Sequence, residues 1–335
     1  MIAAAAPVAD QELLLEVRDL VVEFPGGARA ADGVSFDIRR GEVFGIVGES
    51  GSGKSTVVRS LIRLLPGEAR VLSGEVRYGG RNLVELSERR LRLVRGAEIG
   101  MIFQDPLAAL NPVLPVGLQI TEGLRHHEAL SRSAVRKRVL ETMALVGLPD
   151  PRRLLRTYPH ELSGGLRQRV AIAIALVSSP RLLLADEPTT ALDVTIQDQI
   201  LKLLVGLRDR LGMSVVLVTH DLGVVAQTCQ RVAVMYAGRI VETAPVEQLF
   251  ASPAHPYTQA LLESIPRGRA VDAKVRAIPG APPDLDELPS GCRFAPRCRF
   301  ALDTCRVTDP QLEQHAPGQL SACIRHAELE ELRRA

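Results

Sequence analysis

Residues 48–56 read GESGSGKST and carry the first recognisable chemistry of the chain. They satisfy the pattern G-x-x-x-x-G-K-[ST], in which glycines let successive backbone N–H groups turn toward one anion. A buried-strand pattern precedes the loop and a helical pattern follows, so the helix N-terminus adds a partial positive charge. Lys54 is expected to reach the β- and γ-phosphates of a nucleotide, and the Ser55 hydroxyl to ligate Mg²⁺. The residues predicted to contact phosphate or metal here are Gly48, Ser50, Gly51, Gly53, Lys54, Ser55 and Thr56.

A pair of acids ends the apolar run 182–185 and could supply the second half of such a site. Adjacent side chains on a strand point to opposite sides, so Asp186 and Glu187 can divide the work. Asp186 is expected to hold Mg²⁺ through water, and Glu187 to act as general base on the attacking water. Two acids at a strand end can also be merely solvated, and the phosphate loop is what favours the catalytic interpretation.

Residues 162–176, LSGGLRQRVAIAIAL, lie just before this strand and resemble the signature motif of ABC-transporter ATPases. Gln104 resembles the Q-loop residue of that family, residues 191–193 its D-loop, and His220 its switch histidine. With the phosphate loop and the acid pair, six motifs stand in the family's order. Leu166 departs from the commonest signature, which has Gln at this position, and we expect no loss of activity from the change.

The resemblance implies that two such domains enclose two ATP molecules, each between the phosphate loop of one domain and the signature of the other. Ser163 and the two glycines after it would serve the partner's ATP, and as a helix start they suit an anion. Gln104 would sense Mg²⁺ and the attacking water, and His220 would hold the γ-phosphate and orient Glu187. Phe24 would stack on adenine, although a Phe at a strand end can also belong to the core. The nucleotide-binding residues added by the resemblance are Phe24, Gln104, Ser163, Gly164, Gly165 and Asp193.

Alternating strand and helix patterns must position these motifs. Apolar runs predict strands near 13–24, 34–38, 43–47, 96–104, 181–186, 214–219, 231–236 and 239–243, and helices are predicted near 55–65, 117–130, 132–146, 165–178, 194–210 and 221–228. This pattern indicates an α/β fold with helices on both faces of a largely parallel sheet. The resemblance makes it a P-loop NTPase of the ABC type, with a mixed sheet core, an antiparallel β subdomain and a helical subdomain at about 105–165. We expect the ATPase domain at 12–250 and a small, loop-rich, Cys-containing module at 251–335.

Two further segments, at 103–120 and 252–266, resemble the ATPases of oligopeptide and dipeptide permeases. This implies an ATP-binding subunit of a peptide importer, peripheral to the cytoplasmic face of the inner membrane. Its partners would be a second homologous ATPase, two permease subunits and an external substrate-binding protein. The alternative is a soluble ABC ATPase of DNA repair or chromosome maintenance, which would insert a coiled coil or zinc modules. About 59 residues (163 minus 104) separate Gln104 from Ser163, without sustained heptads, so we favour the importer.

Four cysteines of the C-terminal module, Cys292, Cys298, Cys305 and Cys323, are spaced C-x5-C-x6-C-x17-C. Four thiolates can hold a [4Fe–4S] cluster or a tetrahedral Zn²⁺. The paired knuckles of structural zinc are absent, and the resemblance also favours the cluster, with zinc or plain reduced thiols as alternatives. Neighbouring arginines are expected to offset the thiolate charge: Arg293, Arg297, Arg299 and Arg306. Cys229, at a helix end, is expected to be a buried thiol.

Composition excludes other classes of protein. The 335 residues are 46% hydrophobic and 24% charged, as in a globular chain. Forty-one Lys and Arg against 39 Asp and Glu leave a net charge of +2, so no basic field marks a nucleic-acid partner. No run reaches the roughly 18 apolar residues of a membrane span, and the start MIAAAAPVADQ reads as a disordered lead-in without the basic region of a signal peptide. Five cysteines in such a chain are expected to be reduced or metal-bound in the cytosol.

Overall fold

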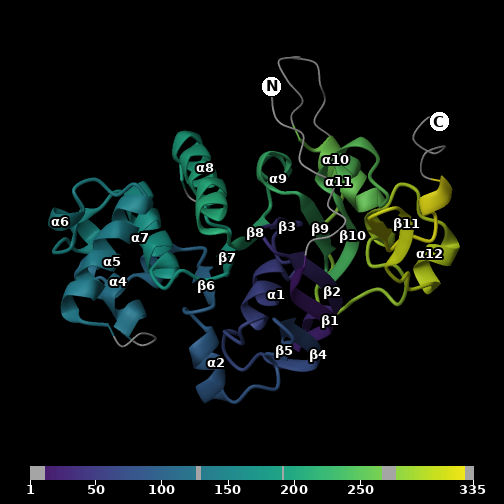
Figure 1. Cartoon of the computed structure of the whole chain (residues 1–335). Helices are drawn as coiled ribbons and strands as arrows, with labels where there is room; N and C mark the ends of the chain where they lie inside the picture. Colours follow the sequence, from purple (N-terminus) through teal and green to yellow (C-terminus); the bar gives the residue numbers. More distant parts are fainter. Residues whose placement is uncertain (1–11, 126–129, 191, 266–276, 329–335) are drawn as a thin grey trace.

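A computed structural model describes residues 12–125, 130–190, 192–265 and 277–328 (Figure 1). Several predicted features lie wholly or partly outside these ranges. They are the N-terminal lead-in, the end of the helix predicted at 117–130, Ala191 of the D-loop, the end of segment 252–266, and the last residues of the C-terminal module.

Among the described residues the central sheet has eight strands in the order β11-β12-β10-β9-β3-β8-β7-β6. Their bounds are Val43–Val47 (β3), Ile99–Ile102 (β6), Leu182–Asp186 (β7), Ser214–Thr219 (β8), Arg231–Tyr236 (β9), Arg239–Pro245 (β10), Glu313–Ala316 (β11) and Gln319–Ser321 (β12). Strands β6, β7, β8, β3 and β9 pair in parallel, and β10 and β12 continue the sheet antiparallel. Every residue of β3, β7 and β8 is buried, as expected where both faces are covered. The predicted mixed α/β sheet is therefore confirmed.

A second, antiparallel sheet covers one side of the central sheet. Its order is β2-β1-β4-β5, with β1 at Leu13–Glu23, β2 at Arg29–Arg39, β4 at Arg70–Tyr78 and β5 at Arg81–Asn82. Helix α1 (Lys54–Ser60) packs in the core between the two sheets, where Val57 and Val58 share one apolar cluster with Phe44 of β3 and Val17 of β1. The phosphate loop is thus held at the end of a strand buried on both sides.

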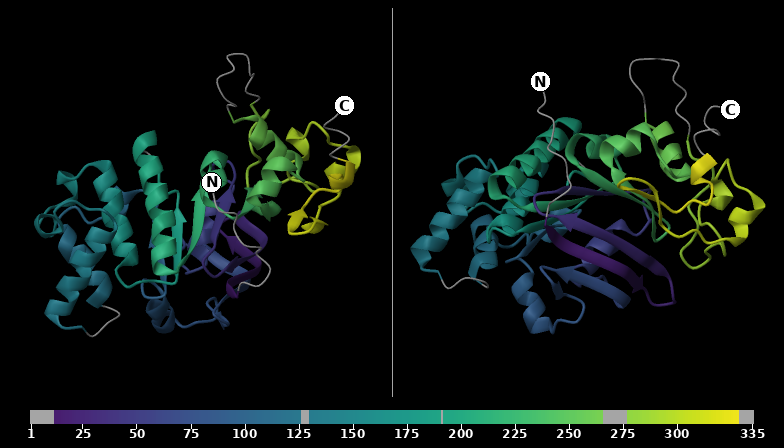
Figure 2. Two further views of the ribbon diagram at one scale, coloured as in Figure 1. Left: turned by 45° about the horizontal axis from the view of Figure 1, so that its top comes forward. Right: turned by 45° about the vertical axis from the view of Figure 1, so that its right-hand side comes forward.

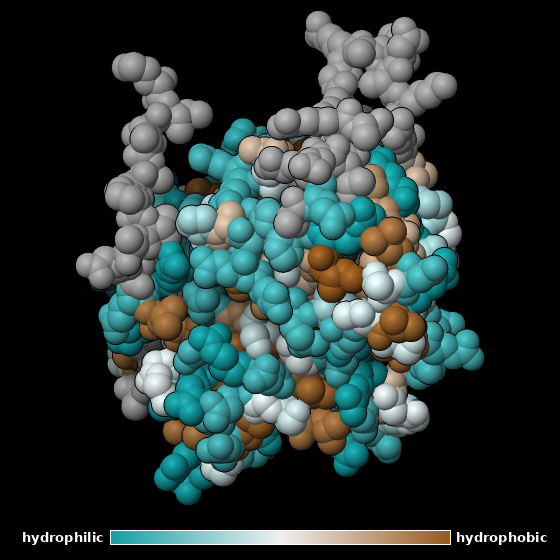
Figure 3. All heavy atoms as spheres, turned by 90° about the vertical axis from the view of Figure 1, so that its right-hand side faces the viewer, coloured by the Kyte–Doolittle hydropathy of each residue, from teal (hydrophilic) through white to brown (hydrophobic). Residues whose placement is uncertain are grey.

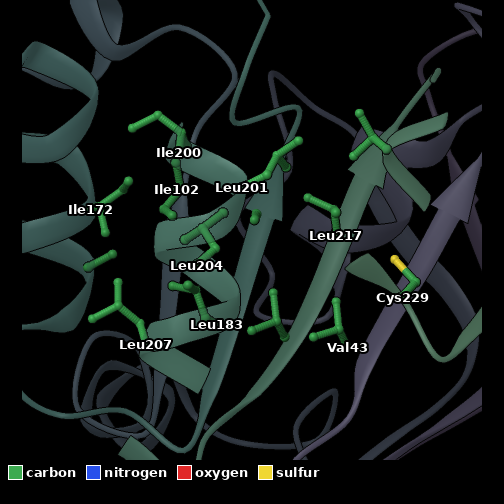
Figure 4. Close-up of a cluster of buried hydrophobic side chains, with 14 of the residues drawn as sticks. Val43, Ile102, Ile172, Leu183, Ile200, Leu201, Leu204, Leu207, Leu217 and Cys229 are labelled. Carbon is green, nitrogen blue, oxygen red and sulfur yellow. The ribbon is translucent and has the colours of Figure 1, made fainter. Parts of the chain in front are cut away.

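Helices form a separate region beyond the β6 edge, drawn at the left of Figure 1. They are α3 (Pro106–Ala109), α4 (Val116–Arg125), α5 (Arg132–Leu145), α6 (Pro151–Leu154), the 3-10 turn Pro159–Glu161 and α7 (Gly164–Leu176). Helix α2 (Glu88–Val94) lies apart from them, with Leu91 and Val94 in the apolar cluster between the two sheets. Helix α8 (Val194–Leu211) lies across the sheet and joins this region to it, with Leu204 and Leu207 packed near Leu183 and with Ile172 of α7 on its other side (Figure 4). Helix α9 (Leu222–Thr228) ends at Cys229, a buried thiol whose pKa burial raises to about 12.

The C-terminal part lies at the opposite end of the molecule from the helical region in both views of Figure 2. It contains α10 (Val246–Ala251), α11 (Pro256–Glu263), α12 (Asp303–Val307) and two 3-10 turns, Ala295–Arg297 and His326–Glu328. Strand β12 pairs with β10 of the central sheet, Ser321 opposite Glu242. Hydrophilic side chains dominate the outer face at this end, with hydrophobic ones scattered among them (Figure 3). In the part of the chain that the structure describes, no helix combines the length and apolarity needed to cross a bilayer.

Candidate functional site

The phosphate loop leaves β3 and turns into α1 through glycines with left-handed backbone angles. Gly53 has φ 99°, and a Cβ atom built on it would lie 1.9 Å from the carbonyl oxygen of Ala30. Gly51 has φ 79° at the exposed tip of the loop, beside exposed Ser50. At Gly53 an L side chain would cause both strain and collision, and at Gly51 it would cause strain alone.

Lys54 lies folded back beneath this loop. Its Nζ donates to the carbonyl oxygens of Gly48, at 2.9 Å, and Glu49, at 2.8 Å, and the residue is 4% exposed. Burial lowers the pKa of the Lys54 ammonium, and the nearby carboxylates of Glu187 and Asp186 act in the opposite direction. An ammonium held under an anion-binding loop is placed to meet phosphate.

Asp186 is fully buried at the end of β7 and touches α1. Its Oδ1 accepts from the Ser55 hydroxyl at 2.7 Å, and its Oδ2 accepts from Nη2 of Arg59 at 3.0 Å. A hydroxyl beside a carboxylate is the oxygen donor set that Mg²⁺ prefers, so the residues fit the predicted metal. Arg59 was not predicted; its spacing four residues after Ser55, on the same helix face, was the available signal.

Glu187 is the point where the predicted catalytic residues meet. Its Oε2 accepts from Nε2 of Gln104 at 3.2 Å and from Oγ1 of Thr190 at 2.8 Å, and lies 3.5 Å from Nδ1 of His220. The residue has φ 45°, a left-handed conformation that non-glycine residues adopt rarely and mostly at functional sites. Side chains from three separate loops therefore surround one carboxylate oxygen. Thr190 was missed because a Thr three residues after an acid has no sequence signature.

The signature and D-loop residues lie elsewhere on the surface. Exposed Ser163 caps α7 by accepting from the N–H of Leu166 at 3.4 Å, with Gly164 and Gly165 in the first turn. Exposed Asp193 caps α8 in the same way at 3.0 Å. In the described part of the chain neither side chain bonds to the phosphate loop.

Phe24 follows β1 in a tight turn, where its N–H donates to the carbonyl oxygen of Ala28 at 2.9 Å. Its side chain is half-buried and belongs to neither buried apolar cluster of the described chain. The segment that follows runs beside the phosphate loop, since the carbonyl oxygen of Ala30 faces Gly53. A ring left out of the core next to this loop is free to contact a base.

The four tail cysteines line one small cavity together with Phe294, Phe300 and Pro256. Burial raises the pKa of Cys298 to about 11 and that of Cys323 to about 12. Among the described residues, however, no group of three or more candidate ligands is close enough to hold a metal ion. The four predicted ligands thus lie around one cavity, and the cluster itself stays a prediction.

The arginines expected to offset the thiolate charge contact carboxylates instead. Three of them make charge-assisted hydrogen bonds, which are stronger than a bond to a protonated thiol, and Arg306 lies 3.9 Å from its acid. The pairs are Arg293 with Asp32, Arg297 with Glu49, Arg299 with Glu263 and Arg306 with Asp303. The offset of thiolate charge stays a prediction, and two of these arginines, Arg293 and Arg297, contact the nucleotide-binding part of the chain.

Comparison with known proteins agrees with this arrangement. Residues 31–190 match the ABC transporter family model, and residues 241–305 match that of the oligopeptide/dipeptide transporter C-terminal region. A probable peptide ABC transporter ATP-binding protein of Sinorhizobium fredii is 55% identical over 323 residues, 95% of this chain and 96% of that protein. The oligopeptide transport ATP-binding protein of Bacillus subtilis is 51% identical, over 86% of this chain and 82% of its own.

Among solved structures, a dimeric ATP-binding cassette in a post-hydrolysis state bound to ADP and Pi superposes with a TM-score of 0.63. It is 32% identical and covers 70% of this chain and 99% of its own. The family-model match at residues 31–190 includes the strand-loop-helix that forms the phosphate site. The chain therefore belongs to the ABC transporter family of ATP-binding proteins.

Proposed function

We propose that this chain hydrolyses ATP to power peptide import through a membrane transporter. The observation that carries the hydrolytic part is the meeting of Gln104, Thr190 and His220 on one oxygen of Glu187, the residue after Asp186. The match of the C-terminal region and the peptide-transport names of the relatives support the transported class. Which peptides are carried depends on other subunits.

Hydrolysis on this account is positioning and charge stabilisation. The loop N–H groups and Lys54 bind the phosphates, and Phe24 stacks on the base. Ser55, Asp186 and Gln104 would hold Mg²⁺, which supplies charge neutralisation when bound. Glu187 takes the proton of the attacking water, and His220 keeps that carboxylate and the γ-phosphate in line.

A second ATPase subunit completes the site. Ser163 and Asp193 are exposed, and Val194 beside them is 82% exposed, an unusual position for a large apolar side chain. A partner subunit that brings its phosphate loop here would cover this surface. The dimer would stay closed while the γ-phosphate lies between the start of α7 and the start of the helix that follows the partner's phosphate loop. Two permease subunits and an external binding protein make up the rest of the importer, with this chain peripheral at the cytoplasmic face of the inner membrane.

The two parts of the chain have different roles in this proposal. Residues 12–250 form the ATPase, with the helical region at about 105–165, and residues 251–335 form the C-terminal module. The module's four cysteines hold a [4Fe–4S] cluster in this proposal. Zn²⁺ requires sulfur atoms drawn in to about 2.3 Å from one ion, whereas a cubane meets its four ligands at separate corners. The four thiols line one cavity, and their wide spacing along the chain, without the paired knuckles of structural zinc, is what supports the cluster.

Purification of the tagged chain from detergent-solubilised membranes tests the importer. We expect it to co-purify with a homologous ATPase and two permeases, and inverted vesicles holding the complex to move labelled peptide only with ATP. Recovery of the chain without permeases would favour the soluble ABC ATPase alternative.

The cluster has a separate test. The chain purified without oxygen is expected to carry about four irons and four sulfides with a broad visible band. One zinc without iron would make the tail a structural zinc site, and no metal would make the cysteines plain thiols; the ATPase assignment stands in each case.

A further inference from the structure

A bidentate ion pair joins the cysteine segment directly to the phosphate loop. Nη1 of Arg297 donates to Oε2 of Glu49 at 2.7 Å, and Nη2 donates to Oε1 at 3.0 Å. The Arg297 side chain is 5% exposed, and its remaining donors contact the carbonyl oxygen of Pro279 at 2.9 Å and the Tyr236 hydroxyl at 3.3 Å. The pair closes a loop of 248 residues, and it is well buried on the arginine side.

Glu49 is the second residue of the phosphate loop and is held at every polar group. Its N–H donates to the hydroxyl of Tyr257 in α11 at 2.9 Å, and its carbonyl oxygen accepts from Nζ of Lys54 at 2.8 Å. Glu49 therefore contacts the C-terminal part through its N–H and carboxylate, and contacts Lys54 through its carbonyl oxygen. A shift of Glu49 would move the carbonyl oxygen that holds the Lys54 ammonium.

A second arginine of the same segment reaches the loop indirectly. Arg293 donates to the carbonyl oxygen of Ala237 and pairs with Asp32. The next residue after Ala237, Gly238, donates its N–H to the carbonyl oxygen of Ser52 at 2.9 Å. Arg293 follows the first tail cysteine and Arg297 precedes the second. The cysteine segment therefore contacts the phosphate loop directly through Arg297 and indirectly, by way of Ala237 and Gly238, through Arg293.

We propose that Arg297 is a positioning residue of the nucleotide site, through which the cysteine segment sets the affinity for Mg–ATP. The proposal rests on the proposed function and adds regulation of the same site. Its physical basis is that Arg297 both fixes Glu49 and neutralises a carboxylate at the edge of an anion-binding loop. Without the guanidinium, an uncompensated negative charge would stand beside the nucleotide phosphates.

Equilibrium titration of the full-length chain with a fluorescent ATP analogue and Mg²⁺ tests this. We expect Arg297→Gln to raise the Kd about tenfold, within the usual range of coupling between sites. Arg299→Gln is the matched control, because Arg299 lies in the same segment but pairs with Glu263 of α11, at 2.7 Å. The control is expected to leave the Kd unchanged, and at saturating ATP Arg297→Gln should keep the wild-type kcat.

A rescue separates positioning from mere damage. In Arg297→Gln/Glu49→Gln the two amides can still hydrogen-bond and no charge is left over, so most of the lost affinity should return. Arg297→Lys keeps the positive charge but not the two parallel N–H donors of the guanidinium, so its Kd should lie between those of wild type and Arg297→Gln. This variant also tests the proposal if Arg297→Gln fails to fold. An unchanged Kd in Arg297→Gln, or a double variant as weak as the single, would overturn the proposal while the ATPase assignment stands. Wild-type chain that binds no Mg–ATP would defeat both.

Discussion

Arg59 is predicted to hold the buried carboxylate of the metal site, and Arg59→Leu should destabilise the fold. Asp186 is fully buried, and Arg59 contributes two hydrogen bonds to its Oδ2, at 3.0 and 3.2 Å. Removing one partner of a buried pair costs about 3–5 kcal/mol in free energy of unfolding. The Arg59 side chain keeps 27% exposure, so water screens its side of the pair and the lower figure of about 3 kcal/mol applies.

Urea unfolding of the full chain, followed by far-UV circular dichroism, measures this loss. Arg92→Leu is the control, because Arg92 is 76% exposed and its pair with Glu88, at 3.6 Å, should contribute less than about 1 kcal/mol. In Arg59→Leu/Asp186→Asn the unpaired charge is gone, and half or more of the stability should return. Equal loss in Arg59→Leu and Arg92→Leu, or a double variant no more stable than Arg59→Leu, would refute the reasoning.

Three further predictions follow from the structure. Gly53→Ala should abolish Mg–ATP binding in the fluorescent-nucleotide titration, because its Cβ would lie 1.9 Å from the carbonyl oxygen of Ala30. Gly26→Ala is the control: Gly26 has the same φ of 99° but open space around it, so the substitution should cause backbone strain alone and leave binding intact. Burial raises the pKa of Glu242 above 4.5, so its stabilising contribution is full below pH 4.5 and lost as pH rises through the raised pKa. Chemical unfolding against pH should therefore show a smaller decline above pH 4.5 in Glu242→Gln than in wild type. Cys298→Ser should lower the iron content of anaerobically purified chain, and unchanged iron would remove that thiol from the ligand set.

Local sequence patterns predict the central strands and the phosphate loop. Strands β3 and β8 begin and end at the predicted residues, because each is a short apolar run buried on both faces. Strand β4 was not predicted, since most of its residues stay at least partly exposed and give no apolar run. Strands β11 and β12 were missed for a related reason: each has few apolar residues and depends on pairing with a sheet already formed.

The site was predictable where a motif fixes residue type and spacing, and not where a contact arises only from folding. Gln104, Glu187 and His220 were chosen by motif order, and the structure brings them together. The pair of Arg297 with Glu49 spans 248 residues, and no local pattern relates the two. The sequence shows Arg297 beside the cysteines, and only the three-dimensional arrangement shows its partner.

Phosphate release by Glu187→Gln tests the central claim most directly. The substitution keeps the size of the side chain and its contact with Thr190, yet removes the group that takes the proton. Hydrolysis should slow by about 10²-fold or more, while the Kd for Mg–ATP stays at the wild-type value. Hydrolysis at an undiminished rate would contradict the assignment of Glu187 as the general base and, with it, the account of the site.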